Sequence, residues 1–121
     1  MAKQRILLID HRPEQLSQPV LRLQLEGYDV ESASSGEDGL RMLREGEFDL
    51  VLLDAELKSN DGWDTLRRIR DDPDLEGVKV IVFMAGSGET GKLALVPVDG
   101  ELRRPFQIGE LLDKVRKVLE D

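Results

Sequence analysis

Five short apolar segments, which alternate with stretches of helical periodicity, constrain the fold of this chain more than any other feature. RILLI at residues 5–9 is followed by DVES at 29–32, LVLL at 50–53, KVIVF at 79–83 and the weaker ELR at 101–103. Short unbroken apolar runs are typical of strands that are buried on both faces. Their alternation with helices predicts right-handed crossovers onto a parallel sheet. We therefore expect a three-layer α/β sandwich with a doubly wound five-stranded parallel sheet in the order 2-1-3-4-5.

The helical stretches carry signals for where each helix begins or is interrupted. Ser35 with Asp38 three residues later resembles a capping box. Pro19 removes a backbone donor inside the first helical stretch, so we expect that helix to start late, with Ser17 as its cap, or to kink. Glycines and a proline within residues 85–100 predict that the fourth helix is short or irregular.

Length, charge and composition limit the classes of function. With 121 residues the chain is expected to be one domain spanning residues 1–121. The net charge of −8 opposes encounter with nucleic acid or an anionic membrane, so we expect no direct contact with either. There is no Cys, which excludes disulfides and thiolate metal sites. No segment has the length and hydropathy of a signal region or a bilayer span, which makes a cytoplasmic location the default expectation.

A glycine-rich segment after the fourth apolar run has the spacing of a phosphate-binding loop. Residues 84–95 read MAGSGETGKLAL, which contains G-x-x-x-x-G-K. However, Leu93 follows Lys92 where a hydroxyl residue is required to hold magnesium, and the segment follows the fourth strand instead of the first. We interpret it as a glycine-rich loop that replaces part of a shortened fourth helix.

Two aspartates follow the first and third apolar runs. Asp10 and Asp54 would lie at the carboxyl ends of neighbouring strands, which are about 4.8 Å apart, so the carboxylates would face each other across one crevice. Like charges at that separation repel, and the arrangement therefore calls for a cation. The alternative is that both are solvated acids that cap the helices that follow.

These motifs resemble the receiver domain of bacterial response regulators, a flavodoxin-like module that accepts a phosphoryl group on an aspartate from a histidine kinase. The resemblance covers the whole length and is carried by ILLIDHRP, GYDVESASSGEDGL, FDLVLLDAELKSNDGWDTLRRIR, VKVIVFMA and ELRRPF. It implies a domain in two-component phosphorelay signalling, with no dedicated enzyme activity beyond its own phosphorylation and dephosphorylation. The implied partners are a histidine kinase or phosphotransfer protein, or an output protein or domain.

Carried over by position, the resemblance implies a phosphoacceptor and a magnesium site. Asp54 would be the phosphoacceptor, and its carboxylate the nucleophile toward phosphorus. Asp10 would be the first acid of the family's metal-binding pair, and the backbone carbonyl of Glu56 a further ligand of Mg²⁺. Asp61 and Gly62 match the family's turn into the third helix.

Four positions depart from the family pattern. The second metal-binding acid is replaced by His11, whose neutral imidazole is a poor ligand for magnesium and would instead favour manganese or zinc, unless it is simply a solvent-facing side chain. The hydroxyl residue that contacts the phosphoryl group is replaced by Met84, which cannot donate a hydrogen bond. Arg104 stands for the family's lysine, and the resemblance predicts a cis peptide bond before Pro105. The aromatic switch residue of the fifth strand is replaced by Glu101.

These departures change the charge balance that a metal ion would meet. Two carboxylates face Arg104, with Arg12 near in sequence, whereas the family site has three carboxylates and one lysine. A guanidinium can bind Asp54 or Asp10 through two hydrogen bonds. We therefore hypothesise that arginine partly replaces magnesium and holds the domain in one state. Two functions remain open: a phosphoacceptor with impaired switching, and a receiver-like module that binds a partner without phosphorylation.

Overall fold

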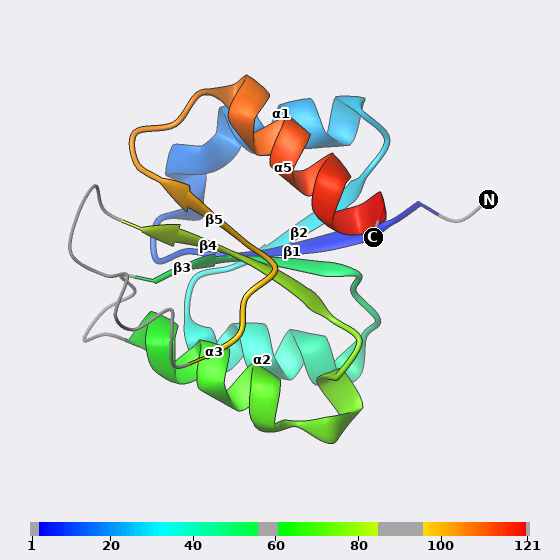
Figure 1. Cartoon of the computed structure of the whole chain (residues 1–121), viewed down its shortest axis with the longest axis vertical. Helices are drawn as coiled ribbons and strands as arrows, with labels where there is room; N and C mark the ends of the chain where they lie inside the picture. Colours follow the sequence, from blue (N-terminus) through cyan, green and yellow to red (C-terminus); the bar gives the residue numbers. More distant parts are fainter. Residues whose placement is uncertain (1–2, 56–60, 85–95, 121) are drawn as a thin grey trace.

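The computed structural model describes residues 3–55, 61–84 and 96–120, and it confirms the predicted sheet (Figure 1). The strands are β1 (Arg5–Ile9), β2 (Asp29–Ala33), β3 (Leu50–Asp54), β4 (Lys79–Met84) and β5 (Gly100–Arg103). All neighbouring pairs are parallel, and the order is β2-β1-β3-β4-β5, as expected. Strands β1 and β3 therefore lie side by side at the point where the connections change direction across the sheet.

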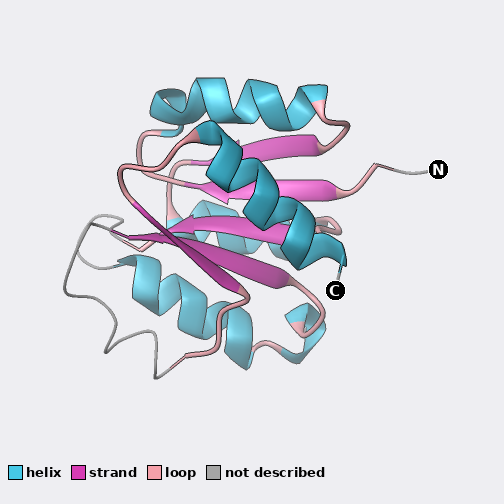
Figure 2. Cartoon of the chain, turned by 45° about the horizontal axis from the view of Figure 1, so that its top comes forward, coloured by secondary structure: helices cyan, strands magenta, loops and turns pink. Residues whose placement is uncertain are grey.

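Helices cover both faces of this sheet. The described helices are α1 (Ser17–Leu25), α2 (Gly36–Glu45), α3 (Asp61–Asp71) and α5 (Ile108–Glu120), with short 3-10 turns η1 (Pro13–Leu16) and η3 (Pro73–Leu75). Helices α1 and α5 pack on one face, and α2 and α3 on the other (Figures 1 and 2). None of these described helices is both long and apolar enough to cross a bilayer.

Alternate residues of each central strand supply the two halves of the core. In β1, Ile6 and Leu8 join the cluster under α1 and α5, whereas Leu7 and Ile9 join the cluster under α2 and α3. All five residues of β3 are buried, while both edge strands are more exposed. This pattern explains why the central strands read as continuous apolar runs and why the β2 and β5 segments read more weakly.

The predicted helix starts are partly confirmed. Ser35 caps α2, since its hydroxyl oxygen accepts the backbone N–H of Asp38 at 3.1 Å. The first helix starts late, as expected, but the prediction that Ser17 is its cap is wrong. A 3-10 turn precedes the helix, so the chain is already helical at Ser17, and the cap position is Leu16 without a side-chain hydrogen bond. The prediction of a short fourth helix concerns residues 85–100. Residues 85–95 lie outside the described residues, and residues 96–99 are not helical before β5 begins at Gly100.

The peptide bond between Arg104 and Pro105 is cis, as the resemblance predicted. It directly follows β5. The backbone N–H of Arg104 donates to the carbonyl oxygen of Met84 at 2.8 Å. This bond continues the pairing of β4 with β5 and holds Arg104 at the carboxyl edge of the sheet.

Candidate functional site

The two predicted acidic residues lie together where β1 and β3 end. Ile9 pairs with Leu53 across the two strands, so Asp10 and Asp54 follow at matched positions. Their side chains are only 4% and 1% exposed. Adjacent parallel strands end at one edge of a sheet, and for this reason the sequence brings two carboxylates into one cleft.

Arg104 extends its guanidinium to both carboxylates. Its Nη2 donates to Asp10 Oδ2 at 2.9 Å, and its Nη1 lies 3.5 Å from Asp54 Oδ1. The prediction had Arg104 bind one of the two aspartates through two hydrogen bonds, whereas the structure has it bridge both. The planar fork of a guanidinium reaches two acceptors at once, which a compact ammonium group does not do.

His11 faces the same two carboxylates through its Nδ1 atom. This atom lies 3.3 Å from Asp54 Oδ2 and 3.7 Å from Asp10 Oδ1. The side chain as a whole is one-third exposed, but Nδ1 itself is buried. The side chain is thus partly solvent-facing, while this nitrogen lies toward the cleft, and a role of His11 in metal binding stays a prediction.

Arg12 contributes through its backbone. Its N–H donates to Asp10 Oδ1 at 2.8 Å, while its side chain is exposed. A backbone N–H satisfies part of the hydrogen-bonding capacity of a buried carboxylate. The assistance that was expected from the Arg12 charge is thus, in the structure, a peptide hydrogen bond that fixes the orientation of Asp10.

The carboxylates of Asp10 and Asp54 are buried away from water, so the charges and hydrogen bonds around them determine whether they can both be accommodated in the cleft. A buried carboxylate without a compensating charge or hydrogen bond is strongly unfavourable, and two such groups would also repel. One guanidinium against two carboxylates leaves the cleft with a net negative charge if His11 is neutral. The cleft therefore attracts a further cation, but with less charge to neutralise than a site of three acids.

The start of α3 packs directly against the backbone at the end of β3. Gly62 lies so near β3 that a Cβ atom there would collide with the backbone oxygen atoms of Asp54 and Ala55. Only glycine permits this approach. Trp63, the next residue, is 8% exposed and packs in the core under α2 and α3.

Met84, at the end of β4, is completely buried. Its side chain belongs to the core cluster under α2 and α3, together with Trp63 and Val82. A thioether supplies no hydrogen-bond donor. At this strand end, apolar packing therefore occupies the position for which the resemblance predicted a hydroxyl group in the family.

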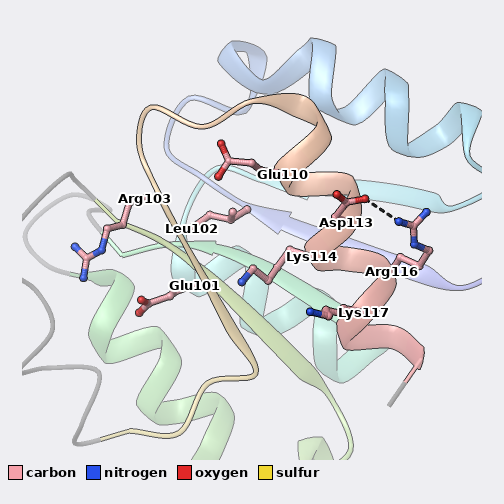
Figure 3. Close-up of a pocket in the computed structure, with 8 residues that line it drawn as sticks. All are labelled: Glu101, Leu102, Arg103, Glu110, Asp113, Lys114, Arg116 and Lys117. Carbon is pink, nitrogen blue, oxygen red and sulfur yellow. Dashed lines mark hydrogen bonds and ion pairs between the residues drawn. The ribbon is translucent and has the colours of Figure 1, made fainter.

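Glu101 lines a groove of about 730 Å³ between β5 and α5 (Figure 3). The lining residues are Glu101, Leu102, Arg103, Glu110, Asp113, Lys114, Arg116 and Lys117. A Cβ atom on Gly100 would lie 3.1 Å from Lys114 Cδ, so the lysine stem packs directly on the strand. Charged side chains of both signs thus surround Glu101, the position to which the resemblance assigned the family's aromatic switch residue.

Sequence reasoning missed the aromatic support of Arg104. The guanidinium carbon lies 5.5 Å from the centre of the Phe83 ring, which stacks on Phe106 at a centroid distance of 5.3 Å. A cation over an aromatic face is attracted by the ring quadrupole. The sequence did hold a signal for this contact: Phe83 ends the fourth apolar run, and Phe106 lies two residues after Arg104.

Some predicted features lie in segments that the structure does not describe. The Glu56 carbonyl, predicted as a metal ligand, falls within residues 56–60. The glycines and Lys92 of the loop that resembles a phosphate-binding loop fall within residues 85–95. Both assignments remain predictions.

The donor set fits a divalent cation, but only in part the one that the resemblance implies. Asp10, His11 and Asp54 each offer one ligand atom, and these atoms lie within 4.8 Å of one another. Magnesium prefers oxygen ligands in octahedral geometry. The two carboxylates supply oxygen ligands, whereas the imidazole supplies a nitrogen. Asp10 and Asp54 would hold a magnesium ion, with His11 as the discordant member.

Comparisons with known proteins identify the family and agree with the fold. The family description "Response regulator receiver domain" matches residues 6–116. The transcriptional regulatory protein PcoR of Escherichia coli is 31% identical over 118 residues, which are 96% of this chain and 51% of that protein. Sensor kinase CckA of Brucella abortus is 31% identical over 121 residues, with coverage of 95% and 12%.

A solved structure gives the same result in three dimensions. The CheY-like receiver domain protein of Methanospirillum hungatei matches with a TM-score of 0.88 at 25% identity, covering 98% of this chain and 95% of that one. The chain spans about half the length of the curated transcriptional regulators that it matches.

Proposed function

The chain belongs to the response regulator receiver domain family of two-component signalling, and we propose that it is an atypical member with impaired switching. In this proposal Asp54 accepts a phosphoryl group, and the resulting change of conformation is weak. The observation that carries the proposal is the bridge of Arg104 between Asp10 and Asp54.

The position of Asp54 supports the role of phosphoacceptor. Asp54 is the last residue of the buried central strand β3, so its carboxylate lies at the carboxyl edge of the sheet. In the reaction, an Asp54 oxygen would form a bond to phosphorus while the bond between phosphorus and the donor breaks, and the leaving group would keep the electron pair. Receiver domains generally bind Mg²⁺, which neutralises charge on the transferred group.

Arg104 changes how much of that charge a metal ion must neutralise. The guanidinium contacts Asp10 and the Phe83 ring, while the backbone N–H of Arg104 is fixed separately by its hydrogen bond to the carbonyl oxygen of Met84. It remains close to Asp54 at 3.5 Å. A fixed cation stabilises negative charge that develops on a phosphoryl group without any reorganisation of the site. We expect weak binding of Mg²⁺ and slow, but not absent, phosphorylation.

Met84 and Glu101 support the impaired response. In the family, a hydroxyl group at the first position follows the phosphoryl group, and an aromatic side chain at the second moves with it. Met84 is fully packed in the core and offers no donor, while Glu101 is charged and lines the groove beside α5. A phosphoryl group on Asp54 would therefore find neither the hydroxyl group nor the aromatic side chain through which the family transmits the change of conformation.

The partners follow from the same proposal. The relatives include a transcriptional regulatory protein and a sensor kinase. For this chain we propose a histidine kinase or phosphotransfer protein as the phosphoryl donor, and an output protein or domain as the receiver of the signal. The net charge of −8 argues against direct binding of nucleic acid by this domain.

A second candidate function is a phosphorylation-independent interaction module. The contacts of Arg104 with both carboxylates favour it, because they stabilise the site without a phosphoryl group or a metal ion. In this case the folded surface alone would bind the partner, and Asp54 would be structural.

One experiment separates these possibilities. The protein is incubated with acetyl phosphate and excess Mg²⁺, its intact mass is measured, and the emission of Trp63, the only tryptophan, is recorded in parallel. Impaired switching predicts an adduct that is absent in Asp54→Asn, with little change in emission or in the amide NMR spectrum. An adduct with a large spectral change would indicate an ordinary switch. If no adduct forms with Mg²⁺, and none forms when another divalent metal replaces it in the same incubation, the interaction module is the correct function.

A further inference from the structure

His11 is the only histidine of the chain, and the chain has no cysteine. Its Nδ1 atom is buried and directed between two carboxylates, at 3.3 Å from Asp54 Oδ2 and 3.7 Å from Asp10 Oδ1. Donor atoms that share one ion at bond lengths of about 2.0–2.2 Å lie roughly 3–4 Å apart. The two distances fall within that range.

The two oxygen atoms of each carboxylate have different neighbours. Arg104 lies against Asp10 Oδ2 and Asp54 Oδ1, whereas His11 faces Asp10 Oδ1 and Asp54 Oδ2. The Arg12 N–H takes one lone pair of Asp10 Oδ1 and leaves the second. One oxygen atom of each acid thus lies on the histidine side of the cleft, so Arg104 need not leave when a cation enters there.

The chemistry of this donor set differs from that of a magnesium site. Imidazole nitrogen suits Zn²⁺ and the later first-row divalent ions, whereas all-oxygen sites suit Mg²⁺. Arg104 already neutralises part of the negative charge, so ligand type matters more for binding here than charge alone. We propose that His11, Asp10 and Asp54 form a site that prefers a divalent transition-metal ion, represented by Zn²⁺, to Mg²⁺.

This inference rests on the proposed function for its biological meaning, since it names the ion that would occupy the phosphorylation site. The binding itself needs no phosphoryl donor, and it can therefore be measured independently. An ion on the histidine side would contact the same carboxylate that is to be phosphorylated. The phosphorylation of Asp54 would then depend on which metal the site holds.

The test uses the protein without a polyhistidine tag, so that His11 is the only imidazole. Zn²⁺ is titrated by calorimetry, and Mg²⁺ is then added in excess as a competitor. Co²⁺ serves as a spectroscopic substitute, because its visible absorption reports nitrogen coordination directly. We expect binding of one ion per chain, a Co²⁺ spectrum with a nitrogen ligand, and little displacement by Mg²⁺.

Two substitutions at one position provide the controls. His11→Gln should lower Zn²⁺ affinity by more than about tenfold, the lower end of the effect of losing even an outer-shell partner. His11→Asp should weaken Zn²⁺ binding and strengthen Mg²⁺ binding. Circular dichroism verifies that both variants fold.

The inference is overturned if wild-type protein binds no Zn²⁺, if His11→Gln retains the affinity within about twofold, or if equal concentrations of Mg²⁺ displace the ion. None of these outcomes decides whether Asp54 is phosphorylated. Conversely, an ordinary phosphorylation switch in the acetyl phosphate experiment would disprove the proposed function and leave the metal preference standing.

Discussion

Arg104 Nη2 donates a hydrogen bond of 2.9 Å to Asp10 Oδ2, across 94 residues of sequence. The same guanidinium lies 3.5 Å from Asp54, so one side chain joins the ends of three strands. This guanidinium neutralises part of the negative charge of the two acids. The predictions below follow from this bridge and from the packing around it.

Removal of the bridge should destabilise the fold. In Arg104→Ala, two buried carboxylates lose their common cation, and we expect a loss of about 1–3 kcal/mol in the free energy of unfolding, less than for a fully buried pair because Arg104 is partly exposed. Urea denaturation measures the change. Millimolar Mg²⁺ should restore part of the stability by replacing the lost charge. Arg103→Ala, on the groove side of the same strand, is the matched control and should change stability little.

Restoration of the coupling pair should restore switching. The double variant Met84→Thr with Glu101→Tyr supplies the hydroxyl group and the aromatic ring that the family uses. Acetyl phosphate with Mg²⁺ should then produce a change in Trp63 emission that wild-type protein lacks. Met84→Ala with Glu101→Tyr removes the thioether without adding a donor. An equal response in that control would show that the hydroxyl group is irrelevant.

The closeness of α3 to β3 depends on Gly62. A Cβ atom in Gly62→Ala would collide with the carbonyl oxygen atoms of Asp54 and Ala55, so the helix must shift. We expect a loss of about 1–3 kcal/mol in unfolding free energy, typical of overpacking. The control is Gly109→Ala, at the second position of α5, where nothing lies within 4 Å of the added carbon. That variant should equal the wild type or exceed it by up to about 1 kcal/mol.

Tyr28 should ionise above its ordinary pKa of 10.0, chiefly because burial disfavours the charged phenolate, while Arg116 opposes this shift. The folded state holds the proton more tightly than the unfolded chain does. Tyr28 therefore contributes stability that is complete below pH 10 and is lost as the pH rises through the folded-state pKa. The absorbance of tyrosinate reports this residue alone, since it is the only tyrosine. Arg116→Gln should raise the pKa further, and a wild-type pKa below 10 would contradict the prediction.

The sheet was predictable from the sequence because its signals are local. The apolar residues of RILLI and all of LVLL are buried in the structure, and the capping signal of Ser35 with Asp38 locates the start of α2 correctly. The Ser17 cap was predicted wrongly. A preceding 3-10 turn has no periodicity that a short stretch of sequence reveals.

The site was only partly predictable, because its geometry is set by contacts between distant residues. The matched strand ends brought Asp10 and Asp54 together, as expected. The division of their oxygen atoms between Arg104 and His11 depends on side-chain directions, and the aromatic ring of Phe83 beside the guanidinium comes from another strand. Periodicity determines which face a residue occupies, but not which atom of a carboxylate it contacts.

The affinity for Mg²⁺ tests most directly the claim that Arg104 takes over much of the charge of the metal ion. Calorimetric titration of the wild-type protein should give binding weaker than millimolar, and Arg104→Lys should bind about tenfold more tightly, as expected for the loss of one charge-assisted hydrogen bond. Wild-type binding of Mg²⁺ at millimolar affinity or tighter, abolished in Asp54→Asn, would contradict the claim.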